Sequence, residues 1–168
     1  MNRLVLLGTG CPAPSYRRFG PSTLIEINGE RYLFDTGSGV TQRLNELGLK
    51  SSDIDFVFIT HIHSDHIVDL YQLYISGWHQ GRNKPFKVIG PVGIKHFFTK
   101  QLESYYDELK LRKEYEMRPN EDGLNYEIIE IDDDFKFDKE NLSIKPFYVD
   151  HAPVNPAYGF KINFKKNK

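Results

Sequence analysis

The chain lacks a second cysteine, a long apolar run and a strong net charge. Cys11 is the one cysteine among 168 residues, so no disulfide can form within the chain. The opening apolar run, Leu4–Leu7, ends at Gly8 and is too short for a secretory signal or a membrane-spanning helix. These features predict a reducing compartment, the cytoplasm, and no membrane contact.

Charges of the two signs nearly balance. The net charge is −1, so the chain lacks the overall basic character of a dedicated nucleic-acid binder. Arg17-Arg18 and the lysines at 165–168 are interpreted as a solvated loop and a chain end. Hydrophobic residues make up 39%, which is typical of a globular protein, and no repeat or linker divides the sequence. We therefore expect one domain over residues 1–168.

Runs of β-branched and aromatic residues alternate with helical patterns. The predicted strands are Leu4–Leu7, Thr23–Ile27, Arg31–Asp35, Asp55–Thr60, Lys87–Ile89, Tyr126–Ile131, Leu142–Val149 and Tyr158–Phe164. The predicted helices are Val40–Leu47, Ile67–Ser76 and a longer one from Val92 to about Met117, broken near Tyr106 and stopped by Pro119. Asn28-Gly29 predicts a hairpin turn. The order of elements predicts the α/β class, with a mixed sheet covered by helices.

Two glycine-rich segments, Gly8-Thr9-Gly10 and Gly37-Ser38-Gly39, lack the lysine of a phosphate-binding loop and the full dinucleotide fingerprint. Both are interpreted as turns. Asp132-Asp133-Asp134 lacks the spacing of a calcium loop and is interpreted in the same way.

Three histidines and a carboxylate are concentrated directly after the apolar strand that ends at Thr60. The pattern is His61, His63, Asp65 and His66. Neutral imidazole and carboxylate are ligands that suit zinc, and four such groups add little to a core. Residues two apart at a strand end point the same way, so His61 and His63 form one half-site. Asp65 and His66 begin the next helix and form a second.

A catalytic zinc needs three protein ligands, so the first half-site requires a third. The remaining histidines are His79, His96 and His151. His151 closes a strand, as His61 does, and is the preferred ligand. His96 lies mid-helix, where a surface or packing role is expected. Trp78 and His79 lie in a predicted loop and are candidates for a substrate pocket.

This pattern resembles the H-x-H-x-D-H motif of the metallo-β-lactamase fold hydrolases. Several segments are similar to the ribonuclease Z branch of that superfamily: 7–12, 33–37, 58–61, 149–151 and 156–160. Gly77-Trp78 and the long helix before Pro119 are more similar to the arylsulfatase-like relatives.

The resemblance implies an αββα sandwich with two zinc ions in a complete site. His61, His63 and His151 would hold the first metal, and Asp65 and His66 the second. Asp35 would orient the ligand loop. The metals would activate a hydroxide, and Asp65 would position it for attack on a phosphodiester, a sulfate or another small ester. The near-neutral charge slightly favours a small ester over transfer RNA. Di-iron redox relatives with this fold carry glutamate in place of the middle histidine of the motif. Position 63 is His, so the resemblance disfavours a di-iron protein.

Members of the superfamily usually supply a further aspartate and histidine after the strand of the third histidine. The resemblance therefore predicts that residues 1–168 are the N-terminal part of such a domain, with one metal held better than two. We also expect exposed apolar surface. The alternative is a mono-metal fragment, or a chain completed by a partner, that has no turnover of its own. A homodimer is among the assemblies we consider.

Overall fold

A six-stranded mixed sheet forms the centre of the protein. The computed structural model describes residues 2–116 and 121–165. The strands of this sheet are β1 (Arg3–Gly8), β2 (Ser22–Ile27), β3 (Glu30–Phe34), β4 (Phe56–Phe58), β5 (Phe86–Gly90) and β6 (Tyr126–Glu130). They lie side by side in sequence order. The pairs β1–β2 and β2–β3 are antiparallel, whereas β3 to β6 are parallel neighbours.

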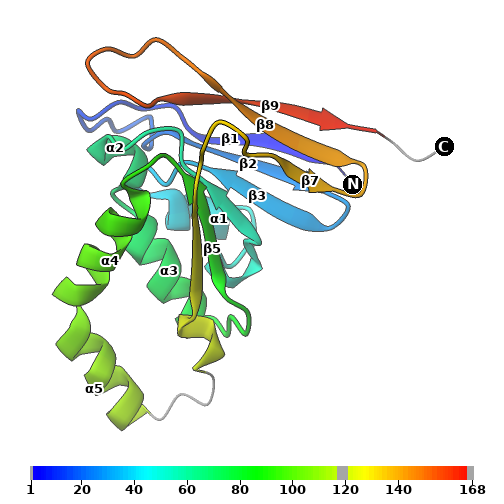
Figure 1. Ribbon diagram of the computed structural model, residues 1–168. Helices are drawn as coiled ribbons and strands as arrows, with labels where there is room; N and C mark the ends of the chain where they lie inside the picture. The colour runs from blue at the N-terminus through cyan, green and yellow to red at the C-terminus, as the bar shows by residue number, and fades with distance from the viewer. Residues whose placement is uncertain (1, 117–120, 166–168) are drawn as a thin grey trace.

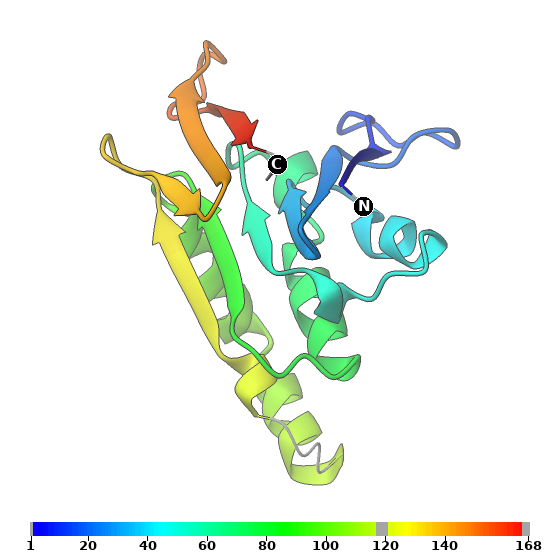
Figure 2. The same cartoon turned by 90° about the vertical axis from the view of Figure 1, so that its right-hand side faces the viewer.

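A second, antiparallel sheet packs on one face of the first, and helices pack on the other (Figures 1 and 2). The second sheet consists of β7 (Phe137–Lys139), β8 (Leu142–Tyr148) and β9 (Tyr158–Phe164). The helices are α1 (Val40–Glu46), α2 (Ser64–Ile67), α3 (Leu70–His79), α4 (Ile94–Ser104) and α5 (Tyr106–Glu116), with short 3-10 turns η1 (Ser51–Asp53) and η2 (Asp122–Leu124). Within the described residues, the layers therefore run helices, sheet, sheet.

Successive side chains of the central strands point to opposite faces of the sheet, so each face has its own hydrophobic core. On β4, Val57 faces the helices and Phe58 faces the second sheet, and both are fully buried. Phe58 stacks on Phe34 of β3, with ring centroids 4.9 Å apart. It meets Phe160 of β9 edge-on at 5.4 Å. These aromatic contacts hold the two sheets together and fix the end of β4, from which the histidine motif follows.

The mixed sheet predicted from the sequence is confirmed, and so is the break between α4 and α5. Met117 and Pro119 lie outside the described residues. Two differences have physical causes. The short β7 was not predicted, because charged residues of both signs flank its one inward aromatic side chain, Phe137. α3 continues through Gly77, which the sequence suggested as its end. A Cβ there would lie 2.4 Å from Arg82 Nη1, so this glycine allows close packing.

Apolar side chains are exposed on the face of β1 opposite its buried residues. Leu4 and Leu6 are 62% and 60% exposed, whereas Leu7 on the other face is buried. The predicted exposed apolar surface is therefore found at this edge strand. None of the described helices is long and apolar enough to span a membrane.

The β2–β3 hairpin turn gives a first testable prediction. Asn28 and Gly29 have φ values of 53° and 84°, and a Cβ on Gly29 would meet nothing within 4 Å. Gly29→Ala is therefore expected to lower the free energy of unfolding by about 1–2 kcal/mol through backbone strain alone. Urea denaturation measures this. Gly29→Asn is the control, since asparagine tolerates this conformation; an equal loss in both variants would contradict the explanation.

Candidate metal centre

The carboxyl ends of parallel strands bring the candidate ligands together. Asp35 follows β3, and His61 follows β4 after a short extension. Because β3 and β4 are parallel neighbours, both side chains lie at the same edge of the sheet. The chain then turns into α2, which carries Asp65 and His66. Figure 1 shows α2 at this edge, above α3.

Three imidazoles from two distant segments meet at one point. His63 Nδ1 lies 3.0 Å from His61 Nε2 and 3.3 Å from His151 Nε2. Nitrogen atoms of all three residues lie within 4.8 Å of one another. Nitrogens that bind one tetrahedral zinc at about 2.0–2.1 Å are about 3.3 Å apart, so this spacing fits a shared ion. His151 is the histidine that joins the group, as its strand-end position predicts.

Backbone contacts bring His151 to the motif. It lies in the loop between β8 and β9, which crosses the end of β4. Tyr158 N, at the start of β9, donates to Thr60 O over 3.0 Å, and Val154 N donates to His151 O over 3.0 Å. The loop is therefore fixed beside His61 although His61 and His151 are 90 positions apart in the sequence.

Asp65 and His66 form a second group beside the three histidines. His66 Nε2 lies 3.7 Å from Asp65 Oδ2. The His66 ring centroid is 4.1 Å from that of His61. The structure thus places the two predicted half-sites next to each other.

Asp35 connects both half-sites. Its carboxylate accepts hydrogen bonds from Thr60 N at 2.8 Å and from Thr60 Oγ1, and it contacts His66 Nδ1 at 2.8 Å. Thr60 Oγ1 in turn lies 2.9 Å from His61 Nδ1. Asp35 is buried and has a φ of 61°, a strained conformation for a residue with a Cβ. Such contacts orient imidazoles and fix their tautomers.

The pKa values of His61 and His66 are shifted in opposite directions by these surroundings. Burial, together with the nearby His66, lowers the pKa of His61 to about 4. His61 is thus neutral at pH 7, as a metal ligand must be. Burial also opposes protonation of His66, but its hydrogen bond to Asp35 and the charges of Asp35 and Asp65 outweigh burial and raise its pKa.

The loop after β3 makes hydrogen bonds to the segment that carries the histidine motif, and the sequence did not reveal these contacts. Thr36 N donates to His66 O at 2.7 Å. Asp69 Oδ2 accepts from Gly39 N at 2.7 Å. Asp69 lies three positions after His66 and directly precedes α3, and its closeness to the histidine motif in the sequence was the available signal. Thr60 gave no signal beyond its position next to His61.

Trp78 and His79 lie away from this centre. Both are at the carboxyl end of α3, whose other end adjoins the motif. Trp78 is buried in the core between the sheet and the helices. His79 lines a separate groove with Tyr71 and Glu108. The structure does not bring either residue to the metal centre, because the segment is helical and not the loop that the sequence suggested.

Sequence comparisons identify relatives of known type. A family model described as "Anti-Pycsar protein Apyc1" matches residues 2–167. Ribonuclease Z of Mycolicibacterium gilvum (strain PYR-GCK) is 34% identical over 168 residues, covering 96% of this chain and 57% of that protein. Ribonuclease Z of Mycobacterium marinum (strain ATCC BAA-535 / M) is 34% identical over 167 residues, covering 98% and 60%. The chain thus spans 57–60% of the length of these curated relatives.

Structural comparisons agree on the fold. Human tRNase Z, short form (ELAC1), superimposes with a TM-score of 0.77 and 27% identity, covering 98% of this chain and 64% of that one. The metallo-β-lactamase fold protein YhfI from Bacillus subtilis gives a TM-score of 0.68 at 19% identity, covering 95% and 56%. The resemblance first seen in the histidine motif is therefore confirmed. The chain belongs to the family described as anti-Pycsar protein Apyc1, and it has the metallo-β-lactamase fold with a ribonuclease Z-like sequence.

Proposed function

We propose that this chain carries the metal-binding part of a metal-dependent hydrolase that cleaves phosphodiesters. The main support is that ring nitrogens of His61, His63 and His151 lie within 4.8 Å of one another. Asp65 and His66 lie directly beside them. The curated relatives are named ribonuclease Z, and one structural neighbour is named tRNase Z. Those names favour a phosphodiester over a sulfate ester.

We further propose that the metal is zinc. Three imidazoles at this spacing suit tetrahedral Zn²⁺, and the low pKa of His61 leaves it neutral for binding. A bound zinc ion lowers the pKa of coordinated water and polarises a phosphoryl oxygen. All three imidazoles come from one chain, so this group does not require the homodimer considered from the sequence. The cytoplasm remains the expected location.

The chain's own residues would divide the work at this centre. His61, His63 and His151 would hold the first ion, and Asp65 and His66 would contribute to a second. The Asp65 carboxylate would also orient the attacking water and accept its proton. Asp35 would hold His66 in the tautomer that directs Nε2 toward Asp65, because its carboxylate contacts Nδ1.

Substrate choice and metal content test the proposal together. The zinc-loaded chain is expected to hydrolyse bis(p-nitrophenyl) phosphate and to show little activity on p-nitrophenyl sulfate. Nitrophenolate absorbance measures turnover, and inductively coupled plasma mass spectrometry measures the zinc content per chain. One zinc without hydrolysis of either ester would instead support the alternative of a mono-metal fragment. A faster sulfate reaction would overturn the substrate assignment.

A further inference from the structure

One hydroxyl group connects the two half-sites of the candidate metal centre. Thr60 Oγ1 lies 3.1 Å and 3.0 Å from the two carboxylate oxygens of Asp35 and 2.9 Å from His61 Nδ1. Asp35 itself contacts His66 Nδ1 at 2.8 Å. We call the contacts that run from Asp35 through the Thr60 hydroxyl to His61 the Thr60 bridge.

The protons of the Thr60 bridge can be placed from these contacts. A carboxylate accepts hydrogen bonds and donates none, so the hydroxyl of Thr60 must donate to Asp35. A hydroxyl has a single proton, so its oxygen must accept a hydrogen bond from His61 Nδ1. The opposite tautomer of His61 would leave two oxygen atoms facing each other without a proton between them, which is costly at the buried carboxylate of Asp35. His61 therefore carries its ring proton on Nδ1.

This tautomer leaves the nitrogen that a metal needs without a proton. His61 Nε2 is then the free nitrogen, and it is the atom that lies 3.0 Å from His63 Nδ1 in the three-histidine group. Asp35 acts in the same way on His66, whose Nδ1 it contacts directly. One carboxylate thus prepares a ligand of each half-site, His66 by direct contact and His61 through Thr60.

The backbone of Thr60 makes separate contacts that do not involve its hydroxyl. Its N–H donates to Asp35 Oδ1 at 2.8 Å. Its carbonyl oxygen accepts from Tyr158 N at 3.0 Å, and this bond fixes the start of β9, beyond the loop of His151. Replacing the Thr60 side chain leaves both backbone bonds in place. A variant without the hydroxyl therefore separates the orientation of the imidazole from the position of the strand end.

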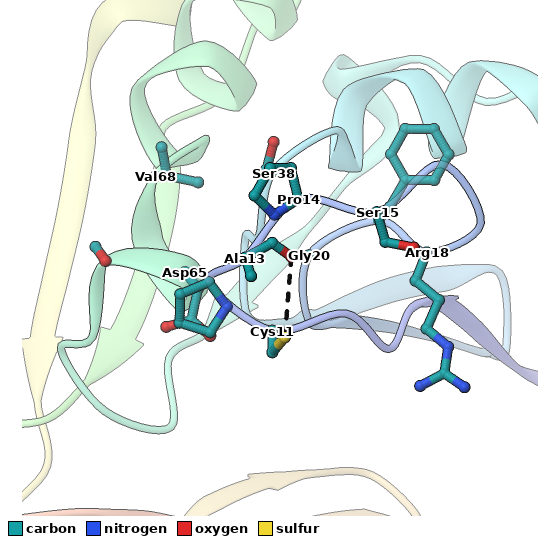
Figure 3. A pocket seen from close by; sticks show the side chains of 12 residues that line it. Cys11, Ala13, Pro14, Ser15, Arg18, Gly20, Ser38, Asp65 and Val68 are labelled. Carbon is teal, nitrogen blue, oxygen red and sulfur yellow. Dashed lines mark hydrogen bonds between the residues drawn. The ribbon is translucent and has the colours of Figure 1, made fainter.

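The Thr60 bridge does not line the cavity beside Asp65. That cavity has a volume of about 490 Å³, and its other wall is the loop between β1 and β2 (Figure 3). Thr60, Asp35 and His61 are not among its lining residues. Thr60 is thus placed to act on the imidazoles and not on a substrate, which is the place of a positioning residue.

We propose that Thr60 is a positioning residue of the metal centre, whose hydroxyl carries the orienting effect of Asp35 to His61 and fixes the Nδ1–H tautomer of that imidazole. This inference rests on the proposed metal-binding function and adds to it a residue that sets the binding state of a ligand. It predicts that removing the hydroxyl alone releases the tautomer of His61 and weakens zinc binding, while the fold is retained.

Variants that differ by one hydroxyl test the inference. Thr60→Val and Thr60→Ala lack the hydroxyl, whereas Thr60→Ser keeps it. Long-range proton–nitrogen correlation spectra of the metal-free chain at mildly alkaline pH report the tautomer of each imidazole. His61 is expected in the Nδ1–H form in the wild type and in Thr60→Ser. In both variants without the hydroxyl, a large share of the Nε2–H form is expected, which a merely structural role of Thr60 would not produce.

Zinc affinity is the second measurement. Loss of a contact that orients a metal ligand costs roughly 10- to 100-fold in affinity. The zinc dissociation constant is therefore expected to rise by that factor in Thr60→Val and Thr60→Ala and to stay near the wild-type value in Thr60→Ser. Competition with a chromogenic chelator measures it. Thr36→Val is the matched control, since Thr36 is a buried threonine whose hydroxyl donates to the backbone oxygen of His66. This control should leave both the tautomer of His61 and the zinc affinity unchanged.

The two measurements separate this inference from the proposed function. An Nε2–H tautomer of His61 in the wild type, or an unchanged tautomer in both variants without the hydroxyl, would overturn the inference. Unchanged zinc affinity in those two variants, or an equal loss in Thr60→Ser, would overturn it as well. If the wild-type chain binds no zinc, the proposed function fails, and the tautomer spectra still decide whether Thr60 fixes His61.

Discussion

Replacing His63 by alanine is expected to weaken zinc binding at least about 100-fold, since even the loss of a residue that merely orients a metal ligand costs roughly 10- to 100-fold. His63 Nδ1 is the central atom of the group, 3.0 Å from His61 Nε2 and 3.3 Å from His151 Nε2. Without it, two imidazoles remain and a tetrahedral ion has half of its positions filled by protein. Competition with a chromogenic chelator measures the dissociation constant.

His79→Ala and His96→Ala are the controls for this experiment. His79 lies at the far end of α3 from the motif, and His96 is exposed on α4. Neither change is expected to alter zinc affinity. Loss of zinc in the His79 variant would show that His151 is the wrong third ligand. Unchanged affinity in the His63 variant would remove that residue from the metal centre altogether.

Most of the candidate metal centre could be predicted from the sequence, because its geometry follows from local rules. His61 and His63 are two residues apart at the end of a strand, so they point the same way. Asp65 and His66 follow at the start of a helix. His151 was selected because it also ends a strand, and the structure places it against His63. In each case the information lies within a few residues of the ligand.

Features that depend on contacts between distant segments could not be predicted in this way. The loop that carries Arg18 lines one cavity together with Asp65, because Gly20 of that loop packs on Ser38. The sequence therefore suggested only a solvated loop. The end of α3 was misplaced for a similar reason, since Gly77 accommodates the buried side chain of Arg82. In both cases a glycine marks a close approach, and a single sequence does not say what approaches it.

Replacing Asp65 by asparagine is expected to reduce hydrolysis of bis(p-nitrophenyl) phosphate by about 10²- to 10⁴-fold, the usual contribution of a positioned acid or base. The same change should leave zinc bound by the three histidines, because Asp65 is not a member of that group. Asparagine has nearly the same shape as aspartate but neither its charge nor its ability to accept a proton. The carboxylate that lies 3.7 Å from His66 Nε2 is thus removed with little change in packing.

Measuring zinc and turnover in the same samples separates the two roles of this residue. The expected result is at least one zinc per chain with a large loss of turnover, and full activity in the control Asp107→Asn, a change on the surface of α5. Loss of all zinc would mean that Asp65 belongs to the primary ligand set and that the division into two half-sites is wrong. Retained activity would assign the proton acceptor to another group. The proposed division of labour therefore depends on this one variant: His61, His63 and His151 hold an ion without Asp65, but cleavage requires its carboxylate.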